Sequence, residues 1–151
     1  MKTKYLYHGS IKKLKGKSLI PRKPQDIEEN QDNLHKAVYA TNIKDVAIAM
    51  AIISCKGVYG ARLKFSKKPY GIIYDGWPRQ EYIYIYTLPP DTFKQTGKIN
   101  KQWVSFKSVK PIKVKRISVK NNLNLIRKAT KKEVNMWCKK YGFDLWEEKL
   151  K

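Results

Sequence analysis

The chain has 151 residues, of which 42% are hydrophobic and 12% aromatic, which suffices for one folded domain with a modest core. No window holds the ~20 continuous apolar residues that span a bilayer, and no apolar stretch follows the basic N-terminus as it would in a signal peptide. We therefore expect one cytoplasmic, monomeric domain over residues 1–151. Its core is expected at about 4–119, with a C-terminal helix and tail at about 120–151.

The charge of the chain is strongly one-sided. There are 33 Lys and Arg residues and 12 acidic residues, which gives a net charge of +21. Residues 101–151 alone contain 15 of the basic residues and 4 of the acidic ones. Such a field attracts polyanions, including nucleic acid, nucleotides and acidic protein surfaces, but it does not choose among them. A solvated basic surface and a specific nucleic-acid groove are equally compatible with it.

The cysteines and histidines indicate no metal centre. Cys55 and Cys138 both fall in predicted helices and lack the spacing of metal ligands, which favours buried thiols in a reducing compartment. His8 and His35 are the two histidines of the chain, so chemistry that needs several histidines is excluded.

The first part of the chain predicts two strands, a long loop and a helix. The elements are a strand at 4–8, a polar loop at 12–33, a strand at 37–40 and a helix over 42–54. Asn42 is expected to cap this helix, with Asp45 in its first turn and Gly57 as its stop signal. Its body is apolar nearly all round, which indicates a buried helix.

The second part predicts further short strands and a late helix. The strands are expected at 59–65, 71–74, 81–86, 102–106 and 112–119, with a loop at 91–101. Thr130 and Glu133 form a capping box, which predicts a helix from Thr130 that ends at Gly142. The residues expected on one face of that helix are Val134, Trp137, Cys138 and Tyr141.

These elements indicate an α+β fold. Six to seven short strands accompany one central buried helix and one C-terminal helix. Because no helix recurs between successive strands, a parallel βαβ sheet is not expected, and the strands should be mainly antiparallel.

Three four-residue segments stand out as candidate site residues. They are Tyr7-His8-Gly9-Ser10, Val38-Tyr39-Ala40-Thr41 and Gln102-Trp103-Val104-Ser105. His8 ends a strand beside Gly9, where the backbone can approach a ligand closely, and Tyr39 precedes a helix. Taken singly, each has an ordinary alternative, namely a packed histidine, a core tyrosine, a helix cap at Thr41 and a surface Gln102.

In this order the segments resemble the ADP-ribosyltransferases of the His-Tyr-Glu class, which includes the PARP-like and diphtheria-toxin-type enzymes. Over roughly residues 4–119 the chain is similar to the small rifampin ADP-ribosyltransferases and related single-domain proteins of bacteria and phage. The resemblance implies a split β-sandwich that binds NAD as a substrate and releases nicotinamide. The ADP-ribose would pass to an acceptor, with nucleic acid ranked above protein because of the charge.

The resemblance also implies roles for individual residues. His8 would hydrogen-bond the nicotinamide-side ribose, and the Gly9 backbone would pair with the carboxamide. Ser10 would lie toward the ribose and Tyr39 would stack on the nicotinamide ring. The implied NAD-binding residues are His8, Gly9, Ser10, Tyr39, Ala40 and Thr41, and the implied catalytic residues are His8, Tyr39 and Gln102.

Gln102 departs from the pattern of the class, which usually has Glu at this position. A glutamine amide can hydrogen-bond but cannot act as a base or supply negative charge. Three outcomes are open. Asp91, or failing that Glu81, could supply the carboxylate; the acceptor could bring its own activated nucleophile; or the protein could bind NAD without turning it over.

Two other functions are weighed against this one. RNA 2′-phosphotransferases also use NAD, but they carry extra arginines, a second site histidine and a preceding basic winged domain, so they rank lower. A non-enzymatic protein could stack single-stranded nucleic acid on Tyr82, Tyr84 and Tyr86, although alternate aromatic residues of a strand are also typical of core packing. The loop at 12–33 lies between His8 and Tyr39 along the chain, which makes it a candidate lid.

Overall fold

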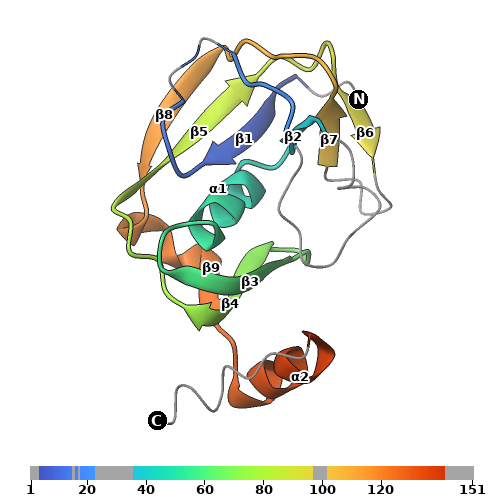
Figure 1. The fold of residues 1–151 in the computed structure, drawn as a ribbon. Helices are drawn as coiled ribbons and strands as arrows, with labels where there is room; N and C mark the ends of the chain where they lie inside the picture. The colour runs from blue at the N-terminus through green and yellow to red at the C-terminus, as the bar shows by residue number, and fades with distance from the viewer. Residues whose placement is uncertain (1–3, 15, 17, 23–35, 97–101, 142–151) are drawn as a thin grey trace.

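The computed structural model describes residues 4–14, 16, 18–22, 36–96 and 102–141. In chain order the elements are β1 (Leu6–Ser10), β2 (Val38–Ala40), α1 (Lys44–Ile53), β3 (Val58–Lys64), β4 (Tyr70–Gly76), β5 (Tyr82–Leu88), β6 (Lys94–Thr96), β7 (Gln102–Ser105), β8 (Lys113–Ser118), the 3₁₀ helix η2 (Lys120–Leu125), β9 (Ile126–Lys128) and α2 (Lys131–Tyr141). Within the described residues the strands form three small sheets, with orders β1-β5-β8, β2-β7-β6 and β3-β4-β9 (Figure 1). The prediction of an α+β fold with mostly antiparallel strands is confirmed, with β4 and β9 as a parallel pair.

Helix α1 lies between two of the sheets. It packs against β1 and β5 on one side and against β3 and β4 on the other (Figure 1). Its buried residues are Val46, Ala47, Ile48, Ala49, Ala51 and Ile52. The small alanine side chains let the strands approach the helix closely, and the predicted buried helix is confirmed, apart from the exposed Met50.

The sheet β1-β5-β8 has a hydrophobic cluster on each face. Along β5, Ile83 and Ile85 belong to the cluster around α1, whereas Tyr86 and Leu88 belong to a second cluster. Side chains of a strand alternate between its two faces, which explains this division. Leu6 of β1 joins the second cluster, together with residues of β2.

Part of the predicted polar loop at 12–33 packs onto this second cluster. Leu19 is only 3% exposed and pairs through its backbone with Val109, while Leu14 donates its N–H to the hydroxyl of Tyr86 at 2.8 Å. The first part of the predicted polar loop therefore contributes to the core. Residues 23–33 lie outside the described residues.

Other boundaries also differ from the predictions. Strand β6 lies inside the predicted loop at 91–101, and η2 and β9 were not expected. Because β9 is the third strand of its sheet and Ile126 is buried, the core extends beyond residue 119. The N-cap residue of α1 is Ile43, which makes no side-chain capping hydrogen bond, so Asn42 is not the cap. The hydroxyl of Thr41 accepts a hydrogen bond from the Ile43 N–H at 3.2 Å.

Helix α2 begins with a capping box and is attached to the sheet β3-β4-β9 by the ion pair of Glu133 with Arg127 and by one aromatic contact. Thr130 N–H donates to Glu133 Oε1 at 2.8 Å and Glu133 N–H donates to Thr130 Oγ1 at 3.2 Å, so the predicted box is confirmed. Trp137 stacks on Tyr74 with ring centroids 5.2 Å apart and lies directly over Gly60. The predicted stop at Gly142 falls outside the described residues. No described helix is long and apolar enough to cross a membrane.

Candidate functional site

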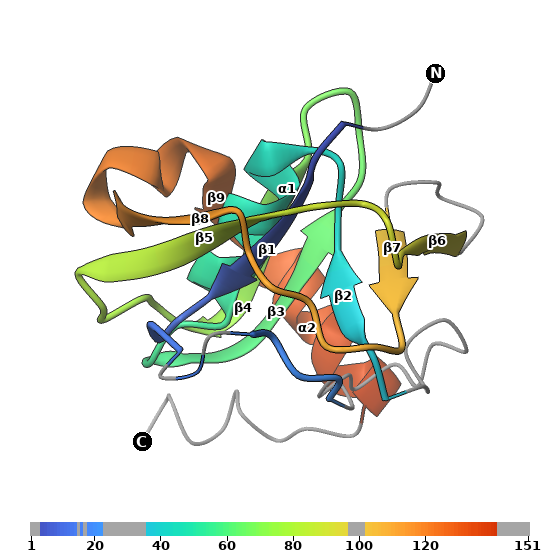
Figure 2. The same ribbon diagram turned by 90° about the horizontal axis from the view of Figure 1, so that it is seen from above.

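Strands β1 and β2, which carry the first two candidate segments, meet at one residue pair. Tyr7 N–H donates to Thr41 O at 2.7 Å, and Thr41 N–H donates to Tyr7 O at 2.9 Å. This bridge joins two sheets into the strand order β8-β5-β1-β2-β7-β6. The three candidate segments therefore lie on three adjacent strands, β1, β2 and β7 (Figure 2).

The side chain of His8 interrupts the pairing of β1 with β2. Hydrogen-bonded pairs of an antiparallel ladder recur every two residues, so the pair after Tyr7 and Thr41 would be Gly9 and Tyr39. Instead, the main-chain oxygen of Tyr39 accepts a hydrogen bond from His8 Nδ1 at 2.7 Å. The imidazole thus uses the acceptor that the Gly9 N–H would use in a continuous sheet, and the ladder ends there.

This interruption leaves the amide groups of Gly9 on an open strand edge. Tyr7 directs its main-chain N–H and C=O toward β2, and Gly9, two residues on, directs its own the same way. The main-chain N–H and C=O of His8 and Ser10 point toward β5 instead. Among the described residues, the N–H and C=O of Gly9 have no strand partner on that edge. On its other side Gly9 presses against α1, because an added Cβ would lie 2.3 Å from Ala47 O.

The electrostatics favour a neutral imidazole at His8. Burial lowers its pKa most, the hydrogen bond to the Tyr39 carbonyl raises it by less than burial lowers it, and the charge of Arg22 lowers it slightly further. Because the carbonyl can only accept, Nδ1 carries the proton, and the neutral ring presents Nε2 as an acceptor. A group that donates an O–H, such as a sugar hydroxyl, matches that acceptor.

Strand register decides which faces the other candidates occupy. Tyr39 pairs with Val104, whereas Ala40 pairs with Trp103 and packs into the second cluster. Alternation therefore directs the Tyr39 side chain to the face of Val104, together with Gln102 two residues before it. His8 lies on the face of Tyr86, with ring centroids 6.4 Å apart. The register thus directs the side chains of His8 and Tyr39 to opposite faces of the strands, and the two residues meet through the Tyr39 main chain. Two rings facing one ligand stay a prediction.

The remaining candidates of the first two segments have structural partners. Ser10 Oγ donates to Lys12 O at 2.8 Å, and Thr41 is buried with its hydroxyl accepting a hydrogen bond from the Ile43 N–H. Ala40 is buried in the second cluster, so it can reach a ligand only through its backbone. Beside Gln102, which pairs with Thr96, the buried Thr96 Oγ1 has no hydrogen-bond partner among the described residues.

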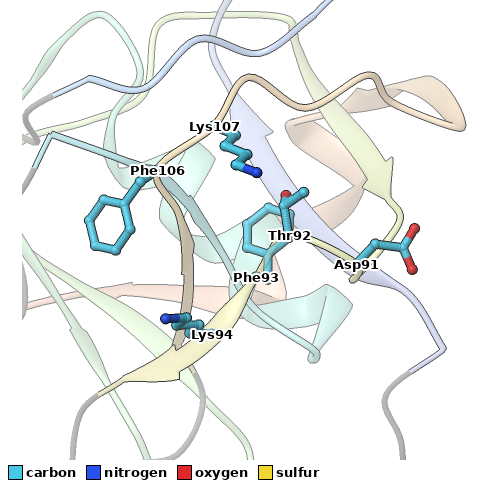
Figure 3. Close-up of a pocket in the computed structure, with 6 residues that line it drawn as sticks. All are labelled: Asp91, Thr92, Phe93, Lys94, Phe106 and Lys107. Carbon is cyan, nitrogen blue, oxygen red and sulfur yellow. The ribbon is translucent and has the colours of Figure 1, made fainter.

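Neither substitute carboxylate lies beside Gln102 in the strand register. Asp91 lines a hollow of about 400 Å³ with Phe106 and Lys94, at the end of β7 opposite to Gln102 (Figure 3). In that view the carboxylate of Asp91 points away from Phe106 and Lys94. Glu81 is exposed and precedes β5, five residues from the Tyr86 that faces His8. In a strand five residues span about 16 Å.

A second hollow, which we call the α1 hollow, was not anticipated from the sequence. It has a volume of about 890 Å³, and its lining residues come from the start of α1, the turn between β3 and β4, and the end of η2 with the start of β9. Its lining includes Ile43, Asp45, Phe65, Lys67, Lys68 and Tyr70. The one sequence signal that pointed there was the run Lys67-Lys68-Pro69 between two predicted strands.

The alternative sites weighed from the sequence find less support. Tyr86 is 4% exposed and Tyr84 packs against the second cluster, so the tyrosines of β5 do not form an open stacking surface. Tyr82 is covered by Arg116, whose guanidinium lies 4.2 Å from the ring centroid. No group of three or more metal-ligating side chains occurs among the described residues. Burial raises the pKa of the Cys55 thiol to about 11, which keeps it protonated.

Comparison of the chain with protein-family models, with curated proteins and with solved structures finds no match.

Proposed function

We propose that this protein is an NAD-dependent mono-ADP-ribosyltransferase that releases nicotinamide and modifies an acceptor recruited by its basic surface. Nucleic acid ranks above protein as that acceptor. The observation that carries the proposal is the interrupted pairing of β1 and β2, where His8 takes the carbonyl of Tyr39 and leaves the amide of Gly9 on an open edge. The +21 charge supports the choice of acceptor.

The chemical groups at the interruption match the nicotinamide riboside half of NAD. The N–H and C=O of Gly9 form a donor and an acceptor side by side, which complement the carboxamide of nicotinamide. The Nε2 of a neutral His8 can accept a hydrogen bond from a ribose hydroxyl. Tyr39 would supply the aromatic surface, and Arg22, whose charge acts on His8, would pair with the pyrophosphate.

The finer fold belongs to the same proposal. We take the two groups of strands on either side of α1 as the halves of a split β-sandwich, with the cleft opening where β1 and β2 part. Cleavage of the glycosidic bond builds positive charge on the ribose, so the site must hold the sugar rigidly. Strands anchored on both sides, β1 by β5 and β2 by β7, suit that task.

The direct test is release of nicotinamide from NAD in the presence of RNA, DNA or protein. Wild type should release nicotinamide and Tyr39→Ala should release far less. Tyr59→Ala is the matched control, because Tyr59 is 69% exposed on β3, outside the candidate segments. Circular dichroism should show that both variants are folded. Absence of release with every acceptor, or equal release by Tyr39→Ala and wild type, would reject the enzyme.

Binding can be tested apart from turnover by thermal denaturation with NAD. A ligand at a hundred times its Kd stabilises the native state by about 2.7 kcal/mol, so millimolar NAD should raise the Tm of wild type. The same addition should raise the Tm of Tyr59→Ala equally and that of Tyr39→Ala less. An unchanged Tm of wild type, combined with salt-sensitive binding of oligonucleotides, would favour the non-enzymatic nucleic-acid-binding protein instead.

A further inference from the structure

The α1 hollow lies close to the proposed NAD site. Ile43 and Asp45 line it, and they follow Thr41, the residue that bridges β2 to β1. A chain reaches at most about 3.6 Å per residue, so the Asp45 backbone is within about 14 Å of the Thr41 backbone. The same helix contacts Gly9 through Ala47. A molecule seated in the hollow would therefore lie beside the first turn of α1, next to the candidate site.

The walls of the α1 hollow combine cations with aromatic rings. Lys67 and Lys68 are exposed in the turn between β3 and β4, and Asp45 is the one carboxylate among the described residues that line the hollow. Phe65 is 39% exposed and is the accessible ring of the hollow, whereas the Tyr70 ring has the guanidinium of Arg127 over it at 5.5 Å from the centroid. The lining cation Arg127 is already paired with Glu133 at 2.8 Å. Phosphates held by lysines with bases stacked on aromatic rings are typical of single-stranded nucleic acid binding.

The chemistry at Gln102 restricts the attacking group of such an acceptor. A glutamine cannot remove a proton, and the register places Asp91 and Glu81 away from it. An acceptor hydroxyl would need a base for its proton. A terminal phosphate, by contrast, is largely a dianion at neutral pH, since its second pKa is about 6. It is already a nucleophile and needs no base.

From these observations, and resting on the proposed function, we propose that the α1 hollow binds a single-stranded nucleic acid whose terminal phosphate is the acceptor of ADP-ribose. A phosphate oxygen forms a bond to the anomeric carbon of the nicotinamide-side ribose. The glycosidic C–N bond breaks, and its electron pair leaves with nicotinamide, which becomes neutral. The phosphate dianion becomes a monoanionic diester, so no proton moves and no oxidant or reductant is needed.

Binding is tested with fluorescent single-stranded RNA and DNA oligonucleotides, each with and without a terminal phosphate. The variant Lys67→Glu/Lys68→Glu should weaken binding at least about tenfold at fixed salt. The control Lys113→Glu/Lys115→Glu makes the same charge change at two exposed lysines of β8 and should weaken it by less than about threefold. Phe65→Ala should weaken it roughly 5- to 150-fold, whereas Phe106→Ala, an exposed phenylalanine of the other hollow, should not.

Equal loss in the hollow and control variants would overturn the site, as would equally strong competition by an acidic polypeptide. Transfer is then followed by mass spectrometry of the oligonucleotides with NAD. Phosphate-ended strands should gain ADP-ribose and hydroxyl-ended strands should not; equal modification of both would overturn the terminal phosphate while leaving the transferase intact. If the hollow variant loses oligonucleotide binding but no acceptor leads to release of nicotinamide from NAD, the proposed function is rejected. The hollow is then supported as a binding site for single-stranded nucleic acid.

Discussion

His8 donates its Nδ1 proton to the main-chain oxygen of Tyr39 across 2.7 Å, and this bond stands where a β-ladder would otherwise continue. Two residues that are 31 positions apart in the chain are thereby held together at the end of two strands. The bond removes one ladder pair and fixes the tautomer of the imidazole, and it leaves the amide of Gly9 without a strand partner on that edge among the described residues.

The burial of His8 predicts a pH-dependent stability. Its folded-state pKa is below the ordinary 6.5, chiefly because burial disfavours the charged ring. The unfolded state therefore binds the proton more readily, and stability rises with pH between the folded and unfolded pKa values. The contribution is present above about pH 6.5 and is lost as pH falls toward the folded pKa. Denaturant midpoints measured from pH 8 to pH 5 should fall for wild type.

The variant His8→Asn should remove that part of the pH dependence and lower stability at pH 8. His35→Asn serves as the control, because His35 is the other histidine of the chain. If His8→Asn kept the full fall of wild type between pH 8 and pH 5, the neutral buried imidazole would be refuted.

The close approach of β1 to α1 predicts the effect of a methyl group at Gly9. An alanine Cβ there would lie 2.3 Å from Ala47 O and 2.8 Å from the Ala51 Cβ, so strand and helix must separate. Gly9→Ala should lower the free energy of unfolding by about 1–3 kcal/mol, as overpacking does. At Gly16 the nearest atom to an added Cβ is 3.7 Å away, and Gly16→Ala should change stability by less than about 1 kcal/mol. Equal midpoints of the two variants in urea would contradict this packing.

Local signals in the sequence predicted the helices well. The capping box of Thr130 and Glu133 depends on two residues in one turn, and it forms as predicted. The apolar run of α1 likewise predicted burial without knowledge of its partners. The cap of α1 was mistaken because Asn42 is a good cap by residue type, whereas the helix begins after Ile43, which has no capping side chain.

Features that depend on distant pairing could not be predicted from the sequence. The three residues of β9 become a strand only because β4 lies parallel beside them, and β6 forms because β7 pairs with it. The candidate segments could be identified by resemblance. The interrupted pairing of β1 with β2 at His8 could not be predicted, because it depends on where the two strands separate. The α1 hollow joins three separate stretches of chain and leaves no periodic pattern.

The anchor of α2 predicts a second pH effect at lower pH. The hydrogen bonds from Arg127, and then from the Thr130 backbone, lower the pKa of Glu133 to about 2. This stabilisation is present above the ordinary value of 4.5 and is lost as pH falls toward 2. Hydrogen exchange in α2 should therefore accelerate between pH 4.5 and 2 relative to exchange in α1, after correction for the intrinsic rate.

Glu133→Gln should lower the free energy of opening of α2 at neutral pH by about 1 kcal/mol, which is the usual contribution of a cap. It should also abolish the acid-dependent acceleration of exchange. Lys132→Gln changes the charge of the neighbouring exposed position and should leave both unaltered. An α2 equally protected in Glu133→Gln and in wild type would show that the stacking of Trp137 on Tyr74 suffices to hold it.

Gln102 offers a gain-of-function test of the proposed enzyme. The side chain sits on β7, on the face that register assigns to Tyr39, and it lacks the negative charge that could stabilise a cationic sugar. Gln102→Glu should restore both the charge and a general base, which typically contributes about 10²-fold or more, and so should accelerate release of nicotinamide to water or to hydroxyl-bearing acceptors. Gln95→Glu on the adjacent strand β6 adds the same charge at an exposed position and should leave the rate near that of wild type. Nicotinamide release that responds equally to both substitutions would indicate a general charge effect and would remove Gln102 from the catalytic set.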